Sequence, residues 1–113
     1  MRPLDARLAL LRQQSRNHRW YSITGWLDRI AIQRAMRGAA VLEKHRPGSV
    51  AQIDPTTVKV DSGYRCPCAQ VYGHWNKTPS RIKSYPFQKG FASLFNKRQS
   101  DAWRKVIAVY AGT

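Results

Sequence analysis

The feature that most constrains the fold is an apolar stripe at helical spacing in residues 24–44. Its members recur every three or four positions and so share one helix face; they are Leu27, Ile30, Ala31, Ala35, Ala39 and Leu42. Asp28 falls in the first turn and Lys44 in the last, where each charge favours the helix dipole. The Pro47-Gly48 pair then stops the pattern. Residues 24–44 are therefore predicted to form one long amphipathic helix.

A last helix is predicted from a cap and a second apolar stripe. Ser100 is assigned as the N-cap, because a serine hydroxyl accepts hydrogen bonds from the free amides of a first helical turn. Trp103, Ile107 and Tyr110 then recur at helical spacing, and Gly112 ends the pattern. Trp103 opens this stripe and is therefore predicted to be buried in the core.

The other segments carry shorter signals. A leucine stripe predicts a first helix over residues 3–16, and Pro67 suits the first turn of a short third helix that begins at residue 66 or 67 and ends near residue 75. A further short helix is predicted over residues 88–95, and a short strand over residues 57–60. Residues 76–84 are polar and are predicted to form a loop.

These patterns together predict a mainly α fold. The expected architecture is a single basic helical domain over residues 1–113, a small bundle of about four helices with at most a minor β element. A chain of 113 residues fits one domain. Its apolar content of 42%, with four Trp, five Tyr and three Phe, supplies enough material for one core.

The cytoplasm is the predicted location. No apolar run reaches the length of a membrane span, and the first twenty residues lack the apolar centre of a secretory signal. Those residues are rich in Arg and poor in acids, as mitochondrial transit peptides are, but Asp5 interrupts that pattern. Cys66 and Cys68 are separated by one proline, too close to bridge comfortably, which indicates a reducing compartment.

The charge balance indicates the class of partner. Twenty Lys and Arg face six Asp and Glu, and the formal net charge is +14. Self-repulsion of this size works against compaction, so a fold that tolerates it usually meets a counter-charge in use. The candidates are a phosphate backbone, an acidic protein face and an anionic membrane surface. No membrane partner is predicted, because the basic helices lack an opposing Trp/Phe/Leu face.

The densest basic segment is residues 77–98, which contain six cations, no acid and several interleaved aromatic rings. Cations supply phosphate affinity, and exposed rings can stack on unpaired bases. Phe91 and Phe95, four residues apart, are predicted to be core, whereas Tyr85 is placed among the binding residues. Arg34 and Arg37 are added from the long helix, although a solvated helix face explains them better than a binding stripe does. The predicted nucleic-acid-binding residues are Lys77, Arg81, Lys83, Tyr85, Lys89, Lys97, Arg98, Arg104, Lys105, Arg34 and Arg37.

Metal binding and catalysis are weakly indicated. Cys66 and Cys68 with His45 and His74 offer zinc-binding side chains, but C-x-C is tighter than the common thiolate spacing and the histidines form no H-x₃₋₅-H pair. Buried thiols are predicted instead, with no metal and no cofactor. A Cys–His nucleophile pair involving His74 is the one enzymatic alternative. The carboxylates are scattered and no phosphate-binding loop occurs, so the chain is predicted not to be an enzyme.

A set of short motifs carries a family resemblance over residues 36–107. The motifs are Gly38-Ala39-Ala40-Val41-Leu42-Glu43, Pro47-Gly48, Ile53-Asp54, Cys68-Ala69-Gln70-Val71-Tyr72-Gly73, Gly90-Phe91 and Ala102-Trp103 followed by Ile107. In these the chain resembles a family of small, uncharacterised helical proteins of actinobacteria and their bacteriophages. Other members have a hydrophobic pair where this chain has Ala69-Gln70, and they are less basic. The resemblance implies a compact helical fold and a phage origin, and it implies no activity.

Two functions from different classes remain open. The first is a small basic nucleic-acid-binding protein, DNA or RNA, that makes mainly backbone contacts. The second is a phage-encoded protein-interaction module that docks on an acidic surface of a host machine such as a polymerase, a nuclease or the ribosome. The acid-free basic segment favours the first. Salt dependence separates the two, because counter-ion release makes nucleic-acid binding steeply salt-sensitive.

Overall fold

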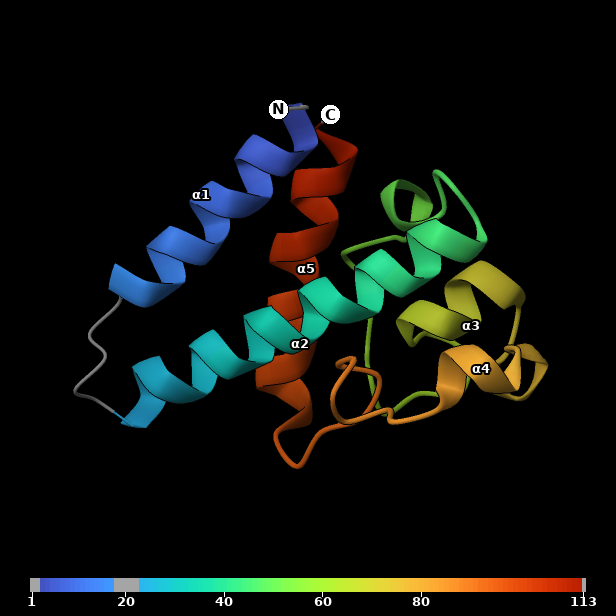
Figure 1. The fold of residues 1–113 in the computed structure, drawn as a ribbon. Coiled ribbons are helices and arrows are strands. Elements are labelled where there is room, and N and C mark those ends of the chain that lie inside the picture. The colour runs from blue at the N-terminus through green and yellow to red at the C-terminus, as the bar shows by residue number, and fades with distance from the viewer. Residues whose placement is uncertain (1–2, 18–22, 113) are drawn as a thin grey trace.

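The computed structural model describes residues 3–17 and 23–112 and shows a helical molecule in which the start of α1 lies beside the end of α5 (Figure 1). Its three long helices are α1 (Pro3–Asn17), α2 (Ile23–His45) and α5 (Asn96–Ala111). Shorter elements join α2 to α5: the 3₁₀ turns η1 (Val50–Gln52) and η2 (Trp75–Lys77), and the helices α3 (Pro67–Tyr72) and α4 (Ser80–Lys83). The predicted mainly α fold is confirmed.

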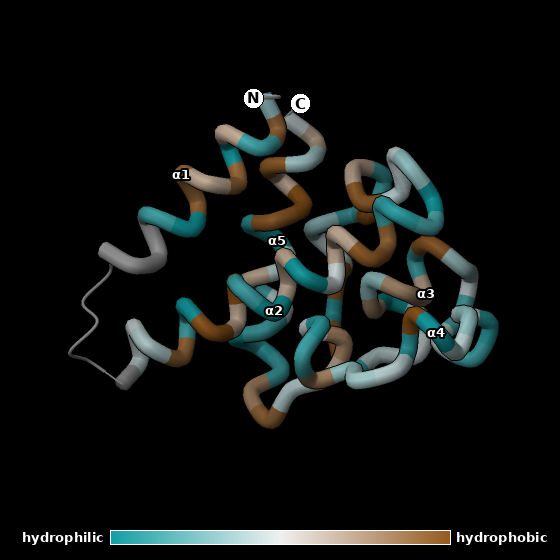
Figure 2. Tube along the Cα trace, viewed as in Figure 1, coloured by the Kyte–Doolittle hydropathy of each residue, from teal (hydrophilic) through white to brown (hydrophobic). Residues whose placement is uncertain are grey.

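The core lies where α2 crosses α5, with α1 packed across both (Figure 1). Each long helix alternates between apolar and polar residues, as amphipathic helices do (Figure 2). The predicted stripe of α2 is confirmed at Ala31, Ala35, Ala39 and Leu42, which are buried. Leu27 and Ile30 are only half-buried, because they line an open groove. The three alanines allow the backbone of α2 to approach its neighbours closely.

Trp103 is at the centre of this core, as predicted, with no exposed surface. Its ring stacks on Phe91 at 5.8 Å, and its Nε1 donates a hydrogen bond of 2.7 Å to the Gly90 carbonyl oxygen. From the previous turn of α5, the Gln99 amide nitrogen donates to the carbonyl oxygen of Ala31, at 2.8 Å. Trp103 therefore joins α5 to the segment around Gly90, and Gln99 joins α5 to α2.

Residues 88–95 do not form the predicted helix. Gly90 has a φ of +72°, a left-handed conformation that interrupts helical structure and favours glycine. A Cβ built on Gly90 would lie 3.0 Å from the amide nitrogen of Ala35 and 2.9 Å from Nε2 of Gln99. The segment is thus wedged between α2 and α5, a position that only a bare backbone fits.

The first turn of α5 also differs from the prediction. The helix begins at Asn96, after an N-cap residue, Phe95, whose side chain makes no capping bond. Ser100 lies inside the helix, where its hydroxyl donates to the Asn96 carbonyl oxygen at 2.8 Å and accepts from the amide of Val60 at 3.1 Å. The predicted N-cap is therefore wrong, because this serine makes a tertiary hydrogen bond. The predicted end at Gly112 is confirmed.

Residues 57–60 are not a strand, and none occurs in the part of the chain that the structure describes. The amide of Val60 bonds to Ser100, and the carbonyl oxygen of Val58 accepts from Arg104 Nη2 at 3.0 Å. Side chains of α5 thus bind backbone groups that a neighbouring strand would otherwise pair. Two boundaries also differ: α3 ends three residues before the predicted boundary, and α4 lies inside the predicted loop over residues 76–84.

Gly38 gives a stability prediction. A Cβ at this position of α2 would collide with the Lys89 carbonyl oxygen and lie 2.8 Å from the Trp103 ring. Alanine normally favours a helix interior over glycine by about 1 kcal/mol. We nevertheless expect Gly38→Ala to lower the free energy of unfolding by about 1–3 kcal/mol, the range for overpacking a core. Urea denaturation measures this, and an unchanged or raised stability would contradict the close approach.

Candidate nucleic-acid interface

The predicted binding residues lie in three groups. The α4 group surrounds that short helix and comprises Lys77, Arg81, Lys83, Tyr85 and Lys89. The α5 group comprises Lys97, Arg98, Arg104 and Lys105, and α2 carries Arg34 and Arg37. In Figure 1, α4 lies beside α3, away from α5. The structure therefore does not gather the whole predicted set into one patch.

The α4 group presents cations and a ring to solvent. Arg81 and Lys77 are exposed, and the Lys83 ammonium lies 5.7 Å from the centre of the Trp75 ring. Tyr85 is 71% exposed and has a φ of +53°, which is uncommon for a residue with a side chain. Pro79 is the N-cap of α4, and a second proline follows Tyr85, so the helix is confined to a single turn. Its side chains are therefore held at the surface by a short, constrained segment.

Lys89, another member of the α4 group, stabilises the C-terminal end of α4. Its Nζ donates to the carbonyl oxygens of Arg81 at 3.3 Å and Ile82 at 3.2 Å, and to the hydroxyl of Ser84 at 3.2 Å. An ammonium at a helix C-terminus satisfies carbonyls that have no intrahelical partner. Lys89 therefore helps to hold the end of α4, and its charge adds to the positive potential there.

Two arginines of α5 have internal partners. Arg98 Nε lies 2.7 Å from Asp28 Oδ1 on α2, and its guanidinium lies over the Phe95 ring at 5.5 Å. Arg104 pairs with Asp101 through Nη1, and its Nε donates to the Pro55 carbonyl oxygen at 2.9 Å. These contacts join α5 to α2 and to residues 55–58. A phosphate contact by either arginine would come in addition to them.

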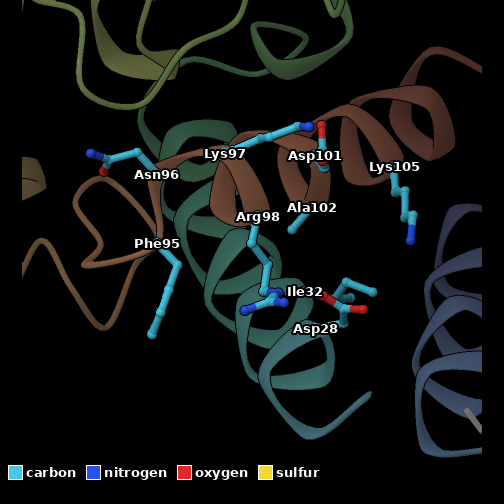
Figure 3. Close-up of a pocket in the computed structure, with 9 residues that line it drawn as sticks. All are labelled: Asp28, Ile32, Phe95, Asn96, Lys97, Arg98, Asp101, Ala102 and Lys105. Carbon is cyan, nitrogen blue, oxygen red and sulfur yellow. Dashed lines mark hydrogen bonds and ion pairs between the residues drawn. The ribbon is translucent and has the colours of Figure 1, made fainter. Parts of the chain in front are cut away.

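Lys97 and Lys105 are the exposed cations of the α5 group. They line a cleft of about 550 Å³ together with Arg98 and the carboxylates of Asp28 and Asp101 (Figure 3). In Figure 3, Arg98 extends from α5 toward Asp28, and Lys105 projects further along the same helix. Charges of both signs meet in this cleft, which makes it a weaker anion site than the acid-free α4 group.

Within the described residues, six predicted cations make no side-chain hydrogen bond and no ion pair; they are Lys77, Arg81, Lys97, Lys105, Arg34 and Arg37. These six side chains can therefore contact an external anion without breaking an internal bond.

No helix of the described part of the chain combines the length and apolar character that a membrane crossing requires.

Sequence reasoning missed a set of exposed apolar side chains. Phe91 is buried as predicted, but Phe95 is about half exposed, so its predicted place in the core is wrong. The two rings were placed on one helix face by their spacing, and the segment between them is not helical. Trp26, Phe87 and Leu94 are exposed as well. The signal against a helix was Gly90, four residues after a proline.

The residues considered for zinc are involved in other contacts. Cys66 and Cys68 are buried free thiols, and Cys66 Sγ accepts from the amide of Ala69 at the start of α3. His74 Nδ1 accepts from the amide of Asn76, and His45 Nδ1 lies 3.0 Å from the Val41 carbonyl oxygen. Among the residues that the structure describes, no three His, Cys, Asp or Glu side chains gather at a possible metal position.

The two buried thiols give a pH prediction. Burial raises the pKa of both above the ordinary value of 9.0, and for Cys68 the neighbouring Cys66 charge raises it further. Unfolded thiols ionise near that value while the folded ones stay neutral, so the stability that the thiols contribute is complete below pH 9 and is lost as the pH rises beyond it. We expect the free energy of unfolding to fall as the pH rises above 9. The fall should be smaller for the Cys66→Ala/Cys68→Ala variant, and equal falls would contradict the raised pKa values.

Comparisons with protein-family models, with curated proteins and with solved structures find no match to the chain. The resemblance carried by residues 36–107 therefore stays a prediction. What the chain binds has to be argued from its charges, its exposed rings and the partners of each side chain.

Proposed function

We propose that the chain binds nucleic acid, mainly by contacts between its cations and the phosphate backbone. The observation that carries this proposal is the α4 group, in which Lys77, Arg81, Lys83 and the exposed ring of Tyr85 all belong to the short segment 77–85 that contains α4. The sequence contains no carboxylate from residue 62 to residue 100, so no acid within that segment neutralises these charges. A cationic surface of this kind attracts phosphates whatever the base sequence.

The exposed ring favours nucleic acid over an acidic protein as the partner of the α4 group. Tyr85 is held at the surface between Ser84, which ends α4, and a proline. An aromatic face next to cations is the arrangement with which proteins bind unpaired bases, because every base has a face that can stack. The surrounding cations hold the phosphates, and the ring adds stacking only where bases are unpaired. Single-stranded DNA or RNA is therefore the preferred form in this proposal.

The cytoplasm is the compartment that we propose for this function. Cys66 and Cys68 are free thiols, which fits the reducing cytoplasm. Nucleic acid is abundant there, and a host cytoplasm would be the setting if the chain is phage-encoded, as the family resemblance implies.

A competition experiment tests the proposal. The protein is bound to a fluorescent single strand of random sequence at low salt, and unlabelled competitors are added at equal negative charge. The competitors are single-stranded RNA, duplex DNA and polyglutamate. We expect single-stranded RNA to displace the probe far more effectively than polyglutamate, because only the RNA combines phosphates with unpaired bases that stack, and duplex DNA to be less effective than the RNA. Equal displacement by polyglutamate would show that the protein binds any polyanion by charge alone, and it would overturn the proposal.

A further inference from the structure

A second surface, independent of the α4 group, is an apolar groove between α2 and the segment that leads into α5. Its volume is about 420 Å³, and its lining includes Trp26, Leu27, Ile30, Arg34, Phe87 and Leu94. Phe95, Arg98 and Gln99 also line the groove. Volumes of about 300–1,000 Å³ are typical of binding sites, and this groove lies at the lower end of that range.

The rim of the groove exposes more apolar surface than folding alone explains. Leu94 is 85% exposed, and Trp26, Phe87 and Phe95 are each about half exposed. In Figure 2 the apolar segment just before α5 lies at the lower edge of the molecule. Scattered single apolar residues are normal on a surface, but several that line one groove mark an interaction site.

The floor of the groove is buried, and its polar side-chain groups have hydrogen-bond partners. Ala31 and Gln99 are buried there, and the Gln99 amide already donates to the Ala31 carbonyl oxygen at 2.8 Å. Within the described residues, no buried side-chain nitrogen or oxygen lacks a hydrogen-bond partner. A ligand in this groove would therefore find no unpaired polar group on the floor, and specificity would be supplied at the rim.

The charges at the rim are all positive. The Arg34 side chain makes no hydrogen bond and no ion pair in the described structure, and Arg98 lies over the Phe95 ring while it pairs with Asp28. Among the residues that the structure describes, no carboxylate lines the groove. Tryptophan and arginine are the residues that most often dominate binding energies at protein interfaces, and aromatic residues in general are enriched there.

We propose that this groove binds the apolar face of an acidic amphipathic helix from a partner protein. The groove supplies apolar contacts for side chains on one helix face, and Arg34 and Arg98 lie where acidic residues flanking that face can pair with them. The net charge of +14 attracts an acidic segment over longer distances. Trp26, Phe87 and Phe95 also offer aromatic faces to a base, but Leu27, Ile30 and Leu94 add aliphatic surface that matches an apolar helix face better than stacked bases.

The probes are synthetic amphipathic helices of about 18 residues, a length at which isolated helices can form. Three acidic peptides carry Leu, Phe or Trp on the apolar face and Glu on the polar face. One control has the same composition in scrambled order, and another has Lys in place of Glu. Each peptide is labelled, and its binding to the full chain is followed by fluorescence anisotropy. Oligo(dT) of matched charge is titrated in parallel.

The variants are Trp26→Ala/Leu94→Ala in the groove and Leu10→Ala as control, an exposed apolar residue of α1 outside the groove. Because all three side chains are about half exposed or more, thermal melts should stay close to that of the parent. We expect at least one acidic peptide to bind about 10-fold or more weakly to the groove variant and unchanged to Leu10→Ala. The scrambled and lysine peptides should bind about 10-fold or more weakly to the parent.

Three results would overturn the inference. The first is that no acidic peptide binds the parent more tightly than its scrambled control. The second is that the groove variant loses affinity for oligo(dT) rather than for the peptides, which would make the groove a stacking site for single strands. The third is self-association of the parent that the groove variant abolishes in light scattering, which would make a second copy of the chain the occupant. Nucleic-acid binding by the α4 group is unaffected by the first and the third.

Discussion

Replacing Trp103 by alanine should lower the free energy of unfolding by about 3–5 kcal/mol, the range for emptying a large buried aromatic site. The ring has no exposed surface, stacks on Phe91 and lies against the position of Gly38, where no side chain can fill the space it leaves. The loss also leaves the Gly90 carbonyl oxygen without its hydrogen-bond donor. A small domain has a total stability of only about 5–15 kcal/mol, so the variant should be marginally folded. Denaturant titration followed by circular dichroism measures the difference.

Trp26→Ala is the matched control for this prediction. It removes the same side chain from α2, but Trp26 is about half exposed and lines the groove. Its removal should cost clearly less than the removal of Trp103, because about half of the side chain already contacts water. If both variants lost equal stability, or if Trp103→Ala unfolded at the denaturant concentration of the parent, Trp103 would not be the centre of the core.

The triple variant Lys77→Ala/Arg81→Ala/Lys83→Ala should bind nucleic acid about 100-fold more weakly at 0.1 M salt. Each phosphate that a cation neutralises contributes about 0.7–0.9 to the slope of log affinity against log salt, so three lost contacts flatten it by about 2–3. In the described structure the side chains of Lys77, Arg81 and Lys83 make no hydrogen bond or ion pair, and the Lys83 ammonium lies over the face of Trp75. The loss should be the same for all base sequences, because backbone contacts do not read bases.

A second triple variant separates contact from overall charge. Lys44, Lys59 and Arg65 are exposed cations outside the predicted binding residues, and their replacement by alanine removes the same charge of +3. We expect this control to reduce affinity much less than the α4 variant does. Equal losses would show that the total charge of the molecule, and not the α4 group, governs binding.

The long helices were predictable from the sequence because each one buries a periodic apolar face. The predicted boundaries of α1 and α2 agree with the structure within one residue. The burial of Trp103 followed from the same periodicity. The start of α5 was not predictable from Ser100, because that hydroxyl makes a tertiary bond to Val60 as well as a local one. A cap signal cannot show which of two partners a side chain will take.

The candidate site was predictable in composition but not in arrangement. The density of cations in residues 77–98 is visible in the sequence, whereas the internal partners of Lys89 and Arg98 lie up to 70 residues away. Arg104 similarly binds the Pro55 carbonyl oxygen. The apolar groove was missed because residues 88–95 were expected to be helical, which would have turned Phe95 inward. Contacts between distant segments decide these points, and periodicity carries no information about them.

The most direct test of nucleic-acid binding is the salt dependence of the dissociation constant of the unmodified protein. A labelled single strand of random sequence is titrated with protein at several salt concentrations from about 50 to about 200 mM. Binding through the α4 group predicts measurable affinity at the lowest salt and a linear plot of log affinity against log salt, with a slope of at least about 2 in magnitude. No binding at the lowest salt, or an affinity that does not change with salt, would contradict it.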